Sequence, residues 1–197
     1  MKADFSTFLA IMYFRTTAMR KMSAELYADM IALQAHVTAT DDRAFEASIR
    51  NFEKEEGRKL SIDQKNKARE QLLNSSGYSV DVPKEQTLIA MEGADKLAKL
   101  LFEMKWSVGQ ANNHFFITSD NPISRRMTIK VKNPLFHDGG FQHKGIEVTF
   151  PLSPKRILIM NWKTSFDGIL EIPRDYVYAE NEQQATNSDT CLYSHVK

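Results

Sequence analysis

Apolar residues in the first part of the chain recur every three or four positions, which is the period of an amphipathic helix. From about Asp4 to Val37 they form a single stripe: Phe8, Met12, Met19, Met22, Leu26, Met30 and Leu33. Neither proline nor glycine occurs between Met1 and Glu56, so no residue of this segment breaks a helix by its own backbone preference. We therefore predict one long first helix over residues 4–37.

Three further helices are predicted before the pattern changes near Trp106. They cover residues 42–56, 61–77 and 84–105. Ser61 and Gln64 have the spacing of a capping box, in which each side chain bonds the backbone amide of the other residue.

Beyond Trp106 the pattern is typical of β-strands. The predicted strands cover residues 114–118, 127–131, 146–150 and 156–161. The last of these is a continuous apolar run, which suits a strand buried on both faces. Residues 108–113 are expected to form a turn.

These elements predict an α+β fold. We expect a helical part over residues 1–106, packed on one face of a small, mostly antiparallel sheet over residues 107–172. A C-terminal helix is expected over residues 173–197. The 197 residues and 42% hydrophobic content are sufficient for one core, so we expect a single domain over residues 1–197.

The composition excludes several classes of protein. A net charge of +1 carries no global signature of nucleic-acid binding. The only cysteine, Cys191, excludes an internal disulfide and a cysteine-based zinc site, and fits a reducing compartment. No apolar run approaches the roughly 18 residues that cross a bilayer, and Asp4 stands where a secretion signal would be apolar. We expect a cytoplasmic protein with no membrane partner.

Charge is distributed unevenly along the chain. Residues 107–170 carry eight basic and four acidic side chains, whereas residues 1–106 carry sixteen of each. The positive excess is a hint of an anionic ligand, although a solvated surface on an ordinary sheet explains it more simply.

Arg15 lies in the middle of the apolar stripe, where a guanidinium group needs a partner or a route to solvent. It either binds a carboxylate or phosphate of a ligand, or forms a buried ion pair that fixes the helix to the sheet. We favour the ion pair and expect Asp120 to be the partner. Arg20 would join Arg15 in binding a ligand only if the helix forms the wall of a cleft.

Residues 118–122 lie where a predicted strand ends, which is a common place for binding and catalytic groups. Asp120 could ligate a divalent metal ion or act as a base, and Ser119 and Asn121 could contact a phosphate. The favoured alternative is a turn, in which the Asp120 carboxylate accepts bonds from nearby backbone amides.

Glu147 alternates with apolar neighbours in a predicted strand, so it faces solvent or, if that face is a cleft, serves as a second carboxylate beside Asp120. His137, Asp138 and His143 share one loop, but their spacing matches no strict metal site. We interpret that loop as surface.

Four segments of the chain, taken in order, carry a resemblance to a known family. They are Phe14–Arg20, Trp106, Phe115–Pro122 and Ile146–Pro154. These segments resemble the successive signatures of the DUF4238 family, a group of bacterial and archaeal proteins of uncharacterised function. The similarity covers most of the chain, and Phe-Phe-Ile-Thr-Ser-Asp-Asn-Pro is its most specific part. Arg-Thr-Thr at residues 15–17 departs from the usual Arg-Thr-Pro.

The resemblance also implies an upstream segment with a His-Tyr-Val-Pro-like opening, which this sequence does not contain. In longer relatives such a segment would cover part of the first helix. We therefore expect an exposed apolar patch near the N-terminus, or a homodimer through the N-terminal helix that hides it. The residues concerned are Phe5, Phe8, Leu9, Ile11, Met12 and Phe14.

Two classes of function stay open at this point. The favoured one is a non-catalytic binding or regulatory domain, in which the polar residues form a structural network. The other is a hydrolase or nuclease-like enzyme that acts on a phosphate-containing substrate and needs a divalent metal. In the enzyme, Asp120 and Glu147 would be catalytic, Asp120 would also hold the metal, and the phosphate would be bound by Arg15, Arg20, Ser119 and Asn121. A closed, mutually satisfied cluster would favour the binding domain, and an open pocket the enzyme.

Overall fold

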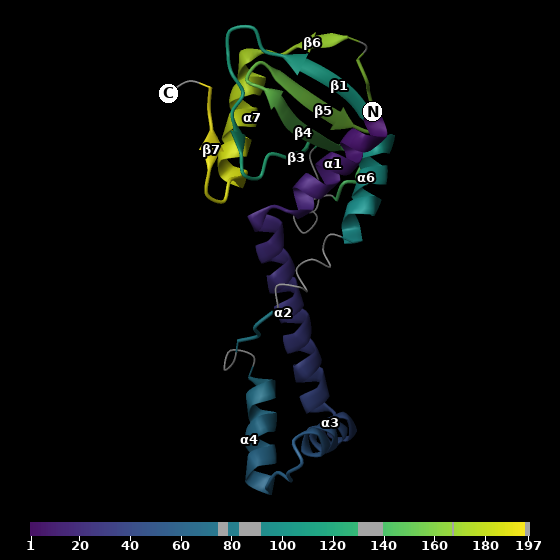
Figure 1. Cartoon of the computed structure of the whole chain (residues 1–197), viewed down its shortest axis with the longest axis vertical. Helices are drawn as coiled ribbons and strands as arrows, with labels where there is room; N and C mark the ends of the chain where they lie inside the picture. Colours follow the sequence, from purple (N-terminus) through teal and green to yellow (C-terminus); the bar gives the residue numbers. More distant parts are fainter. Residues whose placement is uncertain (75–78, 83–91, 130–139, 167, 196–197) are drawn as a thin grey trace. The chain divides into compact units, whose positions relative to one another are not determined.

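The computed structural model describes residues 1–74, 79–82, 92–129, 140–166 and 168–195. Its chain divides into two compact units (Figure 1). The first unit comprises residues 1–20 and 88–197, and the second comprises residues 21–87. The expectation of a single domain stays a prediction.

The elements described in the second unit are helices. It contains α2 (Thr17–Thr40) from residue 21 onward, α3 (Asp42–Glu55) and α4 (Ile62–Leu73). The predicted capping box at the start of α4 is confirmed, because Gln64 N donates to Ser61 Oγ at 3.2 Å and Ser61 N donates to Gln64 Oε1 at 2.9 Å.

The predicted single long first helix is wrong. The chain forms α1 (Lys2–Phe14), which belongs to the first unit, and then α2. Thr16 causes the interruption, because its hydroxyl donates to Tyr13 O at 3.0 Å and accepts from Met19 N at 3.3 Å. A hydroxyl that accepts from the amide three residues later acts as a helix N-cap, so a new helix begins here.

A five-stranded sheet forms the centre of the first unit (Figure 1). Its strands, in sequence order, are β1 (Lys105–Gln110), β3 (Ser124–Met127), β4 (Ile146–Ser153), β5 (Arg156–Asn161) and β6 (Ile169–Glu171). Their spatial order is β3-β4-β5-β1-β6, and every pair is antiparallel except β1 with β6. The α+β class with a mostly antiparallel sheet is confirmed.

Three sequence predictions about the strands are corrected. β3 (Ser124–Met127) ends where the strand expected over 127–131 was to begin, and residues 130–131 lie outside the described residues. Residues 108–110, expected in a turn, belong to β1, where Val108 pairs with Leu158 of β5. The strand expected over 114–118 is reduced to β2 (Thr118–Ser119), which pairs with β7 (Leu192–Tyr193) in a separate two-stranded sheet.

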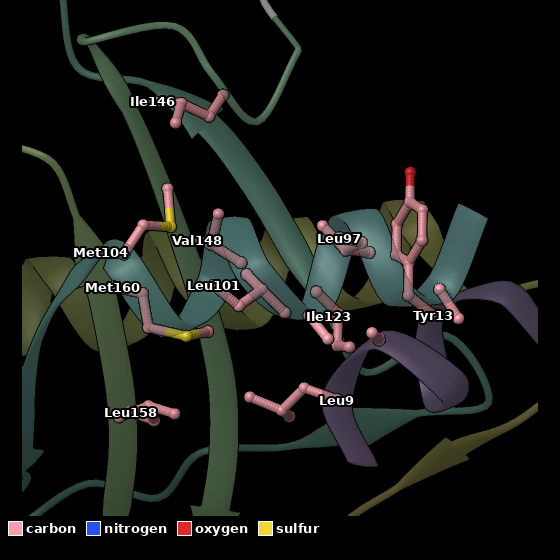
Figure 2. Close-up of a cluster of buried hydrophobic side chains, with 13 residues drawn as sticks. Leu9, Tyr13, Leu97, Leu101, Met104, Ile123, Ile146, Val148, Leu158 and Met160 are labelled. Atoms are coloured by element: carbon pink, nitrogen blue, oxygen red, sulfur yellow. The ribbon is translucent and has the colours of Figure 1, made fainter. Parts of the chain in front are cut away.

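Helices cover both faces of the five-stranded sheet in the first unit, and β5 shows why (Figure 1). Leu158 and Met160 face the core shared with α1 and α6 (Ala94–Glu103), whereas Ile157 and Ile159 face the core under α7 (Arg174–Asn187). Figure 2 shows the first of these cores. The continuous apolar run in β5 is therefore explained by burial of both faces of the strand, as the sequence indicated.

The first helix leaves part of its apolar surface uncovered, as expected. Leu9 is fully buried, but Phe8 is 45% exposed and Ile11 is 40% exposed. Within the residues described, no helix has the length and apolar character needed to span a bilayer.

Candidate functional site

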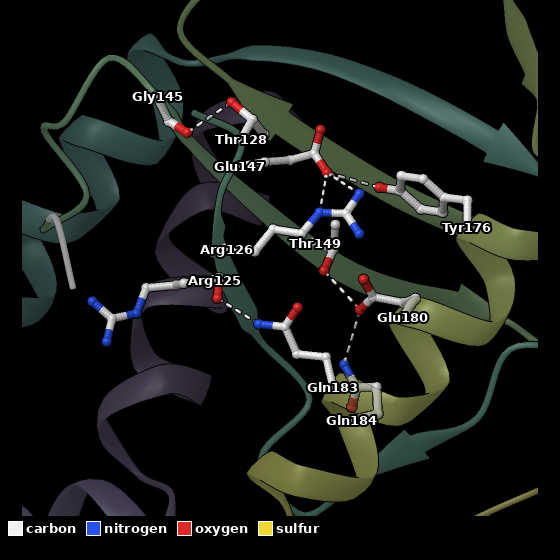
Figure 3. A network of polar contacts seen from close by, with 10 residues as sticks. All are labelled: Arg125, Arg126, Thr128, Gly145, Glu147, Thr149, Tyr176, Glu180, Gln183 and Gln184. Carbon is white, nitrogen blue, oxygen red and sulfur yellow. Dashed lines mark hydrogen bonds and ion pairs between the residues drawn. The ribbon is translucent and has the colours of Figure 1, made fainter. Parts of the chain in front are cut away.

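Polar side chains gather where α7 crosses the sheet (Figure 3). They come from β2, β3, β4 and the inward face of α7, which places segments some 60 residues apart in the sequence side by side. Three of the predicted site residues belong to this network: Ser119, Asn121 and Glu147.

The first part of the network is built around the Glu147 carboxylate. Arg126 Nε donates to Glu147 Oε1 at 2.7 Å, the Arg126 Nη2 atom also contacts this oxygen, and the Tyr176 hydroxyl donates to it at 3.0 Å. The Arg126 guanidinium lies 4.1 Å from the centre of the Tyr176 ring. Glu147 therefore does not simply face solvent: its side chain is 15% exposed and is held by two partners.

Burial, and then the negative charge of Glu147, raise the pKa of the Tyr176 hydroxyl. Tyr176 thus stays protonated and acts as a hydrogen-bond donor. Because Arg126 supplies the positive charge, Arg126, Glu147 and Tyr176 form a charge-balanced, hydrogen-bonded unit around the Oε1 atom of Glu147.

The second part of the network is centred on Glu180, which is fully buried. Its Oε1 atom accepts from the Thr149 hydroxyl at 2.7 Å and from Gln184 Nε2 at 3.4 Å. Its Oε2 atom is buried without a hydrogen-bond partner. Burial raises the pKa of the Glu180 carboxyl, against the effect of the two hydrogen bonds and of the Arg126 charge.

The raised pKa of Glu180 predicts how stability changes with pH. Because the folded-state pKa lies above the unfolded one, the contribution of Glu180 is fully present below the unfolded-state pKa and is lost as the pH rises through the folded-state pKa. In Glu180→Gln this dependence should be absent, so the variant should gain stability relative to the parent as the pH rises. Urea denaturation at a series of pH values measures this, with Glu182→Gln, an exposed acid on the same helix, as control. Parallel pH profiles for parent and Glu180→Gln would contradict the prediction.

The strand-end segment contributes the third part of the network. The Ser119 hydroxyl donates to Gln184 Oε1 at 3.1 Å and accepts from Asn121 N at 3.2 Å. Gln184 Nε2 donates to Pro122 O at 2.9 Å, and Asn121 Nδ2 donates to Asn187 O at 3.3 Å. Ser119 and Asn121 therefore attach α7 to the sheet.

Asp120 points to a different place: its carboxylate accepts from backbone amides, as expected, but from distant ones rather than those of the predicted turn. Its carboxylate accepts from Asp189 N at 3.0 Å, from Thr190 N at 2.9 Å and from the Thr190 hydroxyl at 2.6 Å. The Thr190 hydroxyl, followed by these backbone amides, lowers the pKa of the Asp120 carboxyl. Asp120 N donates to Cys191 O at 3.1 Å, so the whole residue fixes the segment that joins α7 to β7.

The predicted pair between Arg15 and Asp120 is wrong. Arg15 caps the C-terminal end of α1 and is exposed, and within the described residues no ion pair to it is found. Arg20 is exposed as well, and its Nη2 donates to Thr17 Oγ1 at 3.2 Å. The helix break at Thr16 explains the error, because Arg15 no longer lies on a continuous apolar face.

The described residues offer no group of three or more His, Cys, Asp or Glu side chains that could hold a metal ion. Asp120 and Glu147 have separate partners and share none within this part of the chain. Two members of the predicted His-Asp-His loop, His137 and Asp138, lie outside the described residues. His143 Nδ1 accepts from Gly145 N at 3.0 Å.

Sequence reasoning missed the helix side of the site, namely Tyr176, Glu180 and Gln184. The only available signal was their spacing of four, which places them on one face of α7 with the buried Val177. In a polar helix such spacing is equally typical of a solvent-facing side, so it did not identify the network.

Comparison with known proteins identifies the family of this chain. The sequence model of the DUF4238 family, described as a protein of unknown function, matches residues 1–197. The chain belongs to the DUF4238 family. No curated protein and no solved structure matches it.

Proposed function

We propose that this protein is a non-catalytic binding or regulatory domain. The observation that carries the proposal is the Asp120 carboxylate, which accepts hydrogen bonds from the two amides and the hydroxyl of residues 189–190. A carboxylate that ligates a metal or removes a proton needs a free lone pair directed at its target. At Asp120, three of the roughly four acceptor positions of the carboxylate are used to fix residues 189–190.

The other predicted site residues support the same proposal. Glu147 is occupied by Arg126 and Tyr176, and Ser119 and Asn121 attach α7. The alternative, a metal-dependent hydrolase or nuclease-like enzyme, needs Arg15 and Arg20 to face these carboxylates. Both arginines are instead exposed on their own helices.

We assign ligand binding in this domain to a pocket of about 290 Å³ beside β2. It is lined by residues 116–118, 151–154 and 193–195. Lys155 follows the lining residue Pro154 in the sequence, and its Nζ lies 4.2 Å from the centre of the Phe115 ring. An ammonium group next to the lining residues supports the anionic ligand that the charge distribution indicated. A cytoplasmic location completes the proposal, supported by the single cysteine.

The substitution Asp120→Asn tests the proposal. Asparagine replaces one carboxylate oxygen with an NH2 group that cannot accept, so at least one of the bonds from Asp189 or Thr190 is lost. The variant should therefore melt at a lower temperature than the parent, while the parent shows no hydrolytic activity to lose. The measurements are a thermal melt and a phosphatase and nuclease screen with Mg²⁺, Mn²⁺, Ca²⁺ and Zn²⁺. Glu182→Gln, an exposed change on α7, is the control. A metal-dependent activity that Asp120→Asn abolishes without changing the melt would reverse the conclusion in favour of the enzyme.

A further inference from the structure

Helix α2 carries a row of large apolar side chains that are exposed to solvent. The row consists of Met22, Leu26, Met30, Leu33 and Val37, and each side chain is between 53% and 65% exposed. Their spacing of four, four, three and four residues keeps them on one face of the helix. We call this row the α2 stripe; all of it lies in the second unit.

The α2 stripe is not the side by which α2 packs within its own unit. That packing uses the alanine side of the helix, where Ala39 is fully buried and its carbonyl accepts from Arg69 Nε at 2.8 Å. Ala28, Ala32 and Ala35 lie on the same side and are half-buried. The helix therefore has an alanine side that is buried or half-buried and a side of large apolar residues that is exposed.

We propose that the α2 stripe binds the α2 stripe of a second copy of this chain, with the two helices antiparallel. This inference goes beyond the proposed function, because the α2 stripe belongs to the second unit, whereas the pocket beside β2 belongs to the first. The stripe reads almost the same in both directions: reversing one helix places Met22 opposite Val37 and Leu26 opposite Leu33, with Met30 near the two-fold axis. A self-complementary surface of this kind is what a two-fold dimer requires.

Charges at the two ends of α2 favour the antiparallel orientation. The Lys21 end of each helix lies near the Asp41-Asp42 end of the other. A parallel pair would bring each of these ends next to its own like charge, which is unfavourable.

The area of the stripe agrees with a second copy as the occupant. With five side chains more than half exposed, each copy presents on the order of 500 Å² of apolar surface, so pairing would bury on the order of 1,000 Å² in total. That is near the lower limit for a specific interface, and we therefore expect a reversible dimer.

The first experiment measures the mass of the full chain by sedimentation equilibrium over a range of concentrations. We expect a monomer–dimer equilibrium that Leu26→Glu shifts toward monomer by at least ~100-fold in dissociation constant, because each dimer would then bury two unpaired charges. The matched control is Ile31→Glu on the same helix, since Ile31 is 40% exposed and lies away from the stripe. A parent that is monomeric throughout, or an equal effect of both substitutions, would overturn the proposal.

The second experiment tests orientation by cross-linking single cysteines in a Cys191→Ser background, because Cys191 is exposed. A bismaleimide that spans about 8–10 Å, the distance between two packed helices, should link Met30→Cys to itself. It should not link Met22→Cys to itself, but it should link Met22→Cys to Val37→Cys when the two variants are mixed. Self-linking of Met22→Cys would indicate parallel helices and overturn the assigned geometry. Circular dichroism of each variant shows that it is folded.

The Asp120→Asn experiment and the dimer experiments test different proposals, and either proposal can fail without the other. A monomeric parent whose Asp120→Asn variant is destabilised and which has no hydrolytic activity would remove the dimer and leave the binding domain. A dimeric parent with a metal-dependent activity that is lost in Asp120→Asn would leave the dimer and remove the non-catalytic binding domain.

Discussion

Replacing Glu147 with alanine should lower the free energy of unfolding by about 3 kcal/mol, at the lower end of the range for breaking a buried ion pair. The change removes the acceptor of the Arg126 guanidinium and of the Tyr176 hydroxyl together. With side chains of Arg126 and Glu147 only 25% and 15% exposed, water cannot fully replace the lost carboxylate. The positive charge of Arg126 would then remain against the Tyr176 ring without a counter-charge.

Urea denaturation followed by tryptophan fluorescence measures this loss. Both tryptophans of the chain, Trp106 and Trp162, belong to the first unit, so their signal reports on the unit that contains the network. Glu182→Ala, which removes an exposed acid from α7, serves as control and should change stability by less than about 0.5 kcal/mol. A loss below about 1 kcal/mol in Glu147→Ala would show that the ion pair contributes little.

A double variant separates the cost of an unpaired charge from the value of the pair. Arg126→Met combined with Glu147→Leu removes both charges and keeps most of the side-chain volume. Because a pair replaced as a whole leaves no buried charge behind, the double variant should recover most of the stability lost in Glu147→Ala. A double variant as unstable as Glu147→Ala would indicate that packing against Tyr176, rather than charge, is what Glu147→Ala disrupts.

The local features of this fold were predictable because their causes are local. The capping box of Ser61 and Gln64 needs only residues three apart, and the apolar run over 156–161 needs only its own composition. The turn interpretation of Asp120 failed in its partners, because it relied on the preference of aspartate for neighbouring amides. The amide donors belong to Asp189 and Thr190, which are 69 and 70 residues away in the sequence.

The predictions that failed depended on partners distant in the sequence or on a single polar atom. Arg15 was assigned to an apolar face because the periodicity of three and four continues through Thr16, yet one hydroxyl there ends the pattern. The role of Glu180 depends on Thr149 and on its own complete burial, and neither is encoded in the spacing of polar residues on α7. A sequence pattern specifies a face of a helix, but it does not specify what that face meets.

Replacing Leu101 with alanine should cost about 3–4 kcal/mol in free energy of unfolding, the largest effect expected of any single apolar truncation proposed for this chain. Leu101 is fully buried on α6 in the core between that helix, α1 and the sheet (Figure 2). Its neighbours in that core include Leu9 and Val148, which are also fully buried, so the site has no flexible surface side from which to collapse. The variant therefore loses both the transfer free energy of the deleted carbons and the contacts around the cavity that remains.

The same truncation at an exposed position of the same unit isolates the effect of burial. Leu152 in β4 is 41% exposed, so Leu152→Ala removes identical atoms and should cost less than about 1 kcal/mol. Both variants are compared with the parent by urea denaturation with tryptophan fluorescence, which reports on the first unit. Equal losses in the two variants would mean that Leu101 does not lie in a close-packed core, and the assignment of α6 to that face of the sheet would then have to be abandoned.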